Sequence, residues 1–318
     1  MQMSPLRERL RRFASSWTPP LRAELKRYVR SRTIHSLNRT GGPPPHYVLF
    51  PIWLLRRYRP KQSSSDRRFL NDVLWGQFCV YLAFRIKDDL LDDTSDAGRL
   101  VLAADLLQFE SVRTFLLHFP HRSRFWSLYF ESLESTIQGE ARVDSLQKSC
   151  EGSVATLLNE YARVCAIFTI GAAAVCVRYS GMRDLRRARL FWNEIAIAGQ
   201  LLDDVEDLDE DWRRERFNSI VRIMLGKKLS ALARKGLALT AVKKALVVGG
   251  IDRIAQMVLQ RIDRAEEALK PIGGEAPYPP LRHYRKNIDR MRRTMHRESV
   301  RLFFSCVHGT KERSLSPE

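Results

Sequence analysis

Two acidic motifs with identical spacing are the residues of this sequence best suited to chemistry. One reads DDLLD from Asp88 to Asp92, and the other reads DDVED from Asp203 to Asp207. On a helix, the first and last aspartates of each motif share one face, where their like charges repel. Magnesium relieves that repulsion, because it binds carboxylate oxygens and completes its shell with water and substrate phosphates. We therefore predict that six aspartates are magnesium ligands and catalytic residues: Asp88, Asp89, Asp92, Asp203, Asp204 and Asp207.

Long amphipathic helices are predicted to position these motifs. Apolar residues recur at three- and four-residue spacing over several stretches, and alternating strand patterns are rare. Each acidic motif ends one such stretch, and the presence of both favours a metal site over an ordinary solvated acidic face. The expected fold class is all-α, with helices over residues 70–91, 100–117, 125–137, 154–177, 185–205 and 251–269.

The chain is predicted to form a single helical domain over residues 41–308. A loosely tethered basic segment (1–40) precedes it and a polar tail (309–318) follows it. The longest apolar stretch, Ala166–Val177, is predicted to be a buried core helix. It is too short for a transmembrane segment, because a bilayer span needs about 20 residues. No secretory signal is visible, and the five cysteines lack a CxxC pair. These features favour reduced thiols in a cytoplasmic protein.

The net charge of +18 and the pI near 10.1 predict an anionic partner. Nucleic acid, a membrane surface and phosphorylated substrates all fit the charge alone. The basic clusters are not accompanied by a zinc finger or an RNA-binding signature, so we expect no nucleic-acid partner. A phosphorylated small molecule fits both the basic excess and the two aspartate motifs.

The paired motifs resemble those of the trans-isoprenyl diphosphate synthase and class I terpene synthase superfamily. Residues 138–140 (QGE), 161–168 (YARVCAIF, with Arg163 at a lysine position) and 200–204 (QLLDD) resemble other motifs of these enzymes. Gly41-Gly42 resembles the start of their G-G-K-x-x-R motif. The resemblance covers residues 41–218, and the paired aspartate motifs are its most specific part.

The resemblance implies a helical bundle around a central apolar pocket, with the aspartates facing each other across its mouth. There they would hold Mg²⁺ against a prenyl diphosphate, whose allylic bond ionises. Tyr81 and Phe84 precede Asp88 on the same helical face and are the expected aromatic lining of the pocket. Arg85 and Lys87 flank the motif and could balance its charge. The candidate diphosphate-binding residues are Arg163, Gln200, Arg213, Arg216 and Arg285.

Departures from the family pattern favour a cyclase that acts on geranylgeranyl or farnesyl diphosphate. A chain-elongating synthase must also hold a second diphosphate, and the basic residues that do so are missing here. Their places are taken by Pro43, His46, Tyr81 and Ala97-Gly98. Losing several charge-assisted hydrogen bonds, each about 1.5–3 kcal/mol, would leave that substrate weakly held.

The alternative is a prenyltransferase or isoprenyl diphosphate synthase. Arg99 lies one step from the missing double arginine, and the second motif is D-D-x-x-D, as in the synthases. A non-catalytic helical subunit and a basic nucleic-acid adaptor are further alternatives, against which the two intact motifs argue. The resemblance also implies a possible homodimer.

Overall fold

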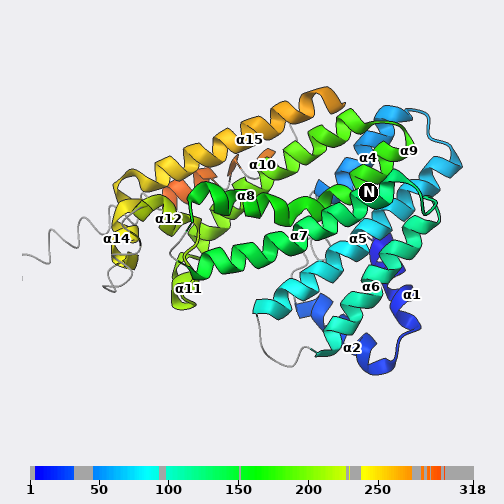
Figure 1. Cartoon of the computed structure of the whole chain (residues 1–318), viewed down its shortest axis with the longest axis horizontal. Coiled ribbons are helices and arrows are strands. Elements are labelled where there is room, and N and C mark those ends of the chain that lie inside the picture. The colour runs from blue at the N-terminus through cyan, green and yellow to red at the C-terminus, as the bar shows by residue number, and fades with distance from the viewer. Residues whose placement is uncertain are drawn as a thin grey trace, which may run out of the picture. The chain divides into compact units, whose positions relative to one another are not determined.

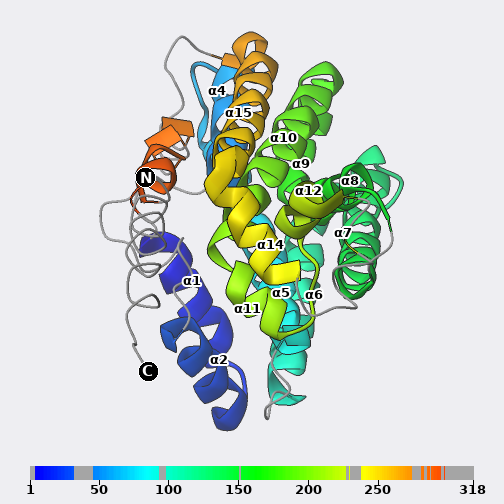
Figure 2. The same ribbon diagram turned by 90° about the vertical axis from the view of Figure 1, so that its left-hand side faces the viewer.

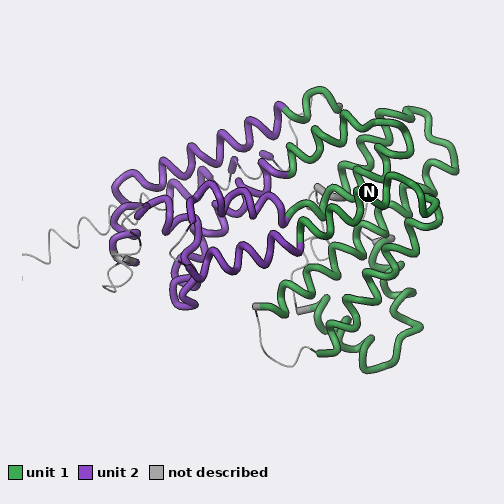
Figure 3. The backbone as a smooth tube through the Cα atoms, in the orientation of Figure 1, with its two compact units in different colours: residues 1–136, 165–192, 268–275 green, residues 137–164, 193–267, 276–318 purple. Residues whose placement is uncertain are grey.

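The computed structural model describes residues 4–31, 46–92, 98–149, 152–226, 229, 238–273 and short pieces between 281 and 297. All regular elements in these ranges are helices, which confirms the predicted all-α class (Figure 1). The chain divides into two compact units, residues 1–136, 165–192 and 268–275, and residues 137–164, 193–267 and 276–318 (Figure 3). The predicted domain limits near residues 40 and 308 lie outside the described residues and stay a prediction.

Unit 1 is built around one long helix, α5 (Ser64–Asp92), which packs against α4 (His46–Tyr58), α6 (Gly98–Leu116) and α9 (Ile170–Arg178). Helix α5 exceeds the predicted 70–91 at its N-terminal end. The side chains of Trp75, Phe78 and Leu82 are fully buried, because neighbouring helices cover several sides of α5. The same unit holds the first parts of α7 (Arg124–Lys148) and α10 (Met182–Glu206) and the end of α15 (Ile251–Gly273).

Residues 4–31 of the basic N-terminal segment pack into this core, so the prediction that they are loosely tethered is wrong. Helices α1 (Ser4–Ser15) and α2 (Pro19–Ser31) are joined by a tight turn (Figure 2). Leu6, Leu10 and Leu25 are buried in one apolar cluster with residues of α5 and α6. Each helix has apolar residues at three- and four-residue spacing, and that stripe is buried against the unit. Most of the arginines face water, whereas Arg9 pairs with Asp72 of α5 at 2.9 Å.

The predicted core helix 154–177 is interrupted. It consists of α8 (Val154–Val164), a 3₁₀ turn η1 (Cys165–Thr169) and α9. In unit 1 the buried amide of Gln77 spans the break: it donates to the carbonyl of Ile167 at 3.1 Å and accepts from the N–H of Gly171 at 2.7 Å. A break frees backbone polar groups that must find partners when buried, and Gln77 supplies them.

The apolar stretch Val154–Arg178 is long and apolar enough to cross a membrane by length and composition alone, but 67% of its most apolar window is buried inside the structure. Every residue from Ile170 to Cys176 is buried. This burial is what the sequence predicted for a core helix.

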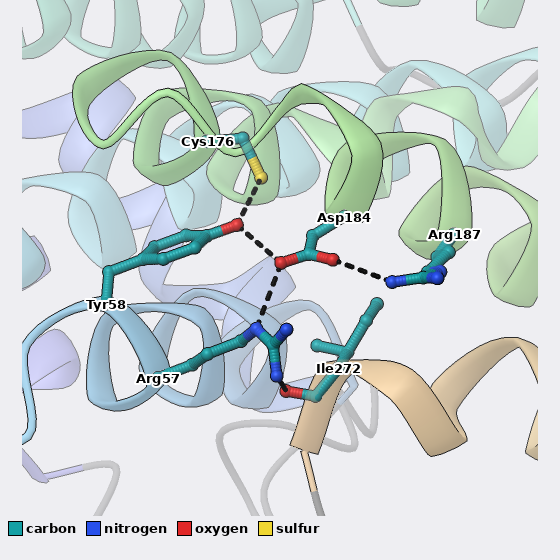
Figure 4. A network of polar contacts seen from close by, with 6 residues as sticks. All are labelled: Arg57, Tyr58, Cys176, Asp184, Arg187 and Ile272. Atoms are coloured by element: carbon teal, nitrogen blue, oxygen red, sulfur yellow. Dashed lines mark hydrogen bonds and ion pairs between the residues drawn. The ribbon is translucent and has the colours of Figure 1, made fainter.

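A buried carboxylate, Asp184, joins helices of unit 1 (Figure 4). It accepts from the hydroxyl of Tyr58 at 2.8 Å, and it pairs with Arg57 and Arg187 at 3.1 Å each. Burial raises the pKa of Tyr58, as do nearby Cys176 and Asp184, so the hydroxyl stays protonated and donates. Asp184 thus holds the end of α4 to the start of α10.

Unit 2 contains α8, α11 (Leu208–Arg213), α12 (Ser219–Leu225), α14 (Ala238–Ala245), the remaining parts of α7 and α10, and most of α15. Helix α12 packs against α8 and α14. The buried side chain of Arg222 on α12 donates to the backbone carbonyls of Leu146, Ser149 and Gly152. Arg222 thereby ties the last turn of α7 and the segment that follows it to α12.

Replacing Asp184 by alanine should lower the free energy of unfolding by about 2–3 kcal/mol, because three donors lose their common acceptor. Urea unfolding followed by circular dichroism measures this. Asp144→Ala is the control, since Asp144 forms an exposed ion pair with Lys148 on one helix, worth about 0.3–0.5 kcal/mol. Equal losses in the two variants would contradict the role of Asp184.

Candidate functional site

The first aspartate motif ends helix α5 in unit 1, where an arginine and a tyrosine contact its first two carboxylates. Arg85, one turn earlier, pairs with Asp88 Oδ2 and with Asp89 Oδ1 at 2.9 Å each. The hydroxyl of Tyr28 on α2 donates to Asp89 Oδ2 at 2.6 Å. Asp88 is 37% exposed at its side chain, whereas the Asp89 side chain is only 8% exposed. The two neighbouring aspartates therefore differ: Asp88 faces solvent and Asp89 is held inside.

The third aspartate, Asp92, is the last residue of α5. Its side chain lies outside the described part of the structure, so its role as a ligand stays a prediction. Lys87 pairs with Asp105 of α6 at 3.0 Å. Arg85 therefore balances the charge of the first motif, as predicted, while the ion pair of Lys87 is with α6.

Tyr81 and Phe84 lie on the last part of α5 and are both half-buried. The Tyr81 ring packs at 5.8 Å, centroid to centroid, on Phe168, which stacks in turn on Trp192 at 5.0 Å. Burial raises the pKa of Tyr81. An aromatic row therefore starts one to two turns before the first motif, and the lining role of Tyr81 and Phe84 remains a prediction.

The second motif ends helix α10 in unit 2, and its middle aspartate is fully engaged. Asp204 is 2% exposed. Its Oδ2 accepts from the backbone N–H of Ser219 at 2.9 Å and from the hydroxyl of Tyr161 at 3.2 Å, and its Oδ1 accepts from Gln200 at 2.8 Å. Burial raises the pKa of Asp204 to about 6, and the hydrogen bonds from Ser219 and Gln200 oppose that rise.

The other carboxylates of the second motif face solvent. Asp203 and Asp207 are both exposed, and Asp207 stands at the N-cap position of α11 without a side-chain capping hydrogen bond. Burial and the neighbouring Glu210 and Glu206 raise the pKa of Asp207. These carboxylates repel one another, and a bound cation would reduce that repulsion.

The carboxylate oxygens of both motifs are of the type that binds magnesium, but those that the structure describes do not yet form a complete ligand set. Each stands at the C-terminal end of a long helix, where the helix dipole adds negative potential to that of the carboxylates. Asp88, Asp203 and Asp207 present accessible carboxylate oxygens, the ligand type that magnesium prefers. Among the described residues, no three acidic, histidine or cysteine side chains already converge as a ligand set.

Most predicted diphosphate-binding residues of unit 2 contact protein groups. Arg163 donates to Glu160 at 3.0 Å and to Gln138 at 2.9 Å, and Gln200 donates to Asp204. Arg285 pairs with acidic residues of α15 at 2.7 and 3.1 Å. Arg213 is exposed and donates to a backbone carbonyl, and Arg216 follows α11 and is half-buried. Their contact with a diphosphate stays a prediction.

The sequence pattern did not reveal three residues that support the motifs. Tyr28 and Tyr161 reach the middle aspartates from 61 and 43 positions away along the chain. Asn218 donates to the carbonyl of Asp204 at 2.9 Å and caps α12 through its side-chain oxygen. Only Asn218 had a local signal, because asparagine before an apolar helical stretch favours the N-cap position.

The two adjacent aspartates of the second motif should respond differently to alanine. Asp204→Ala leaves Tyr161, Gln200 and the N–H of Ser219 without their acceptor, so we expect a loss of about 3 kcal/mol in the free energy of unfolding. Asp203→Ala is the matched exposed control and should change it by less than about 0.5 kcal/mol. Chemical denaturation tests this, and similar losses in both variants would refute the division of roles.

No protein-family model matches the chain, and no curated protein matches its sequence. Its fold does match solved structures. The decaprenyl diphosphate synthase of Rhodobacter capsulatus matches with a TM-score of 0.68 at 13% identity, over 91% of this chain and 94% of that one. The geranylgeranyl pyrophosphate synthase of Lactobacillus brevis ATCC 367 matches with a TM-score of 0.67 at 16% identity, over 91% and 95%.

A third match is the geranylgeranyl pyrophosphate synthetase of the archaeon Geoglobus acetivorans, with a TM-score of 0.60 at 16% identity, over 91% of this chain and 97% of that one. At such low identities, similarity establishes the fold and not the reaction. The chain therefore has the all-helical fold of the trans-isoprenyl diphosphate synthases, as the paired aspartate motifs led us to expect.

Proposed function

We propose that this protein is a magnesium-dependent enzyme that ionises a prenyl diphosphate. The observation that carries the proposal is the pair of D-D-x-x-D sequences, each ending a long helix, in a chain with the isoprenoid-synthase fold. The net charge of +18 supports an anionic substrate. The solved structures that share the fold are named as prenyl diphosphate synthases, which supports the same substrate class.

Within each unit, the accessible aspartates of its motif would hold magnesium. Asp88 in unit 1 and Asp203 and Asp207 in unit 2 have exposed carboxylates, whereas Asp89 and Asp204 are buried against protein donors. Bound magnesium would neutralise the charge that develops on the leaving diphosphate. Asp204, whose two oxygens both accept from protein donors, would fix the end of α10. Asp89, held by Tyr28 at Oδ2 only, would add its Oδ1 to the carboxylate of Asp88.

The chain's own aromatic residues would shield the reactive hydrocarbon. Tyr81 and Phe84 precede the first motif and offer aromatic faces, which attract cations. A pocket that these rings help to close to water would protect a carbocation from capture. We assign the two side chains to the substrate pocket on this basis.

Chain elongation is the fate that the comparisons support. Each of the three solved structures described above is named as a synthase of a long prenyl diphosphate. The D-D-x-x-D form of the second motif also agrees with a synthase. In that reaction the cation would be captured by a second, non-allylic diphosphate.

Cyclisation is the fate that the charged residues of this chain support. Elongation needs basic side chains for a second diphosphate, and the candidates here contact carboxylates. Arg99, beside the place of the missing double arginine, pairs with Glu24 of α2 at 3.2 Å. Arg285 pairs with Asp263 and Glu266. A prenyl cation without an external acceptor would react with its own hydrocarbon chain.

Incubation of the full-length protein with Mg²⁺ and farnesyl or geranylgeranyl diphosphate, with and without isopentenyl diphosphate, separates these fates. Gas chromatography–mass spectrometry, with and without phosphatase treatment, identifies the products. A longer prenyl alcohol that needs both isopentenyl diphosphate and phosphatase would establish elongation. A cyclic hydrocarbon or alcohol formed without isopentenyl diphosphate would establish cyclisation. Asp88→Asn should reduce pyrophosphate release at least about 100-fold with the fold intact; full activity in this variant would refute the proposal.

We propose a cytoplasmic location and a homodimer as parts of the same proposal. The buried thiols of Cys79 and Cys176 are free, which suits a reducing compartment. In unit 1, helix α6 has a row of exposed apolar side chains at helical spacing, and exposed apolar patches of this kind mark interaction surfaces. The row consists of Leu102, Leu106, Phe109 and Leu116, which are 36–69% exposed.

Phe109→Glu should convert a dimer to a monomer, because a symmetric interface would bring the new charge in twice. Light scattering coupled to size-exclusion chromatography would then show the mass fall from twice the chain mass to 36.9 kDa. Leu190→Glu is the control, since Leu190 is 47% exposed on α10, away from the row. A monomeric wild type would refute the dimer.

A further inference from the structure

Tyr28 connects the N-terminal hairpin, which is formed by α1 and α2, to the first aspartate motif. Its hydroxyl lies 2.6 Å from Asp89 Oδ2, to which it donates, and 3.1 Å from the backbone oxygen of Arg85. Tyr28 is 6% exposed and packs in the apolar cluster that α1 and α2 form with α5 and α6. The bond to Asp89 is therefore shielded from water, where a hydrogen bond to a carboxylate is strong.

The two carboxylate oxygens of Asp89 have partners that differ in how easily they can move away. Oδ1 pairs with Arg85 Nη2 at 2.9 Å, and the Arg85 side chain is 46% exposed. A long, half-exposed side chain can rotate into water at small cost. Tyr28 cannot leave Oδ2 without unpacking α2 from the core. Oδ1 is thus the oxygen of Asp89 that can exchange its partner.

We propose that Tyr28 is a positioning residue for metal binding, which rests on the proposed function of the motif. By holding Oδ2, Tyr28 fixes the rotamer of Asp89 so that Oδ1 points to the place now taken by the Arg85 guanidinium. Arg85 now bridges Asp89 Oδ1 and Asp88 Oδ2, and these two oxygens would become available to a divalent cation when Arg85 withdraws.

The N-terminal segment acquires a function in this way. Carboxylates that bind metals are usually oriented by a second partner, and loss of that partner weakens metal binding about 10–100-fold. Here the second partner lies on an element 61 positions earlier in the chain. Folding of the hairpin onto α5 and orientation of the first motif are therefore one event.

The test is titration calorimetry of the full-length protein with MgCl₂ at a fixed concentration of inorganic pyrophosphate, without any prenyl substrate. Tyr28→Phe removes one oxygen atom and should weaken Mg²⁺ binding at least about 10-fold. Tyr179→Phe is the matched control. Tyr179 donates to Asp66 at 2.6 Å, at the opposite end of α5 and about 35 Å from Asp89 by the rise per residue. It should leave Mg²⁺ binding within about twofold.

A second pair of variants tests the assignment of Oδ1 without touching the hairpin core. Arg85→Gln removes the competitor and should tighten Mg²⁺ binding by about threefold or more. Lys87→Gln removes the same charge two residues away and controls for the general electrostatic effect, since Lys87 pairs with Asp105. The tightening should be clearly smaller in Lys87→Gln.

The possible outcomes separate the two levels of the proposal. Absence of saturable Mg²⁺ binding by the wild type would overturn the proposed function and this inference with it. Saturable binding by the wild type, with equal affinities in Tyr28→Phe and Tyr179→Phe, would overturn the role of Tyr28 alone. If Tyr28→Phe does not fold, the Arg85→Gln and Lys87→Gln pair decides: unchanged or weaker binding in Arg85→Gln would overturn the inference.

Discussion

Placing carboxylates at the end of a buried helix is electrostatically unfavourable. Several side chains of this structure offset that by donating hydrogen bonds to the buried carboxylates. A carboxylate loses hydration when neighbouring helices cover it, and the C-terminal end of a helix adds negative potential. Within each unit the middle aspartate of the motif is buried and satisfied by protein donors, Asp89 by Tyr28 and Arg85, and Asp204 by Tyr161 and other groups. The aspartate before each of them stays accessible. Differences in burial thus give neighbouring aspartates of one motif different roles.

The supporting donors come from elements that are distant in sequence. Tyr28 belongs to the N-terminal hairpin, and Tyr161 lies on α8, the first part of the broken helix. Because both tyrosines are also packed among apolar side chains, the geometry of each motif depends on the packing of its own unit. In unit 1 the same dependence appears at Asp184, where a buried carboxylate again connects helices that meet only in the folded chain.

The basic excess of the chain does not by itself create a second anion site. Arg99, Arg163 and Arg285 all pair with acidic side chains, so each would have to give up an ion pair before holding a diphosphate. A half-exposed pair is weak and can be exchanged. The structures that share the fold support elongation, whereas these pairings support cyclisation, and the difference rests on whether such an exchange occurs.

The sequence by itself determined the helical class, most of the long helices and the two motifs at their ends. Helical periodicity and the D-D-x-x-D spacing are local properties, because a turn of helix brings residues four apart to one face. The tertiary structure alone decided that α1 and α2 belong to the core, that the 154–177 helix is broken over Gln77, and that Asp89 and Asp204 are buried while Asp88 and Asp203 are accessible. Burial and long-range hydrogen bonding depend on residues tens of positions apart, and no local pattern records which of two adjacent aspartates a distant tyrosine will reach.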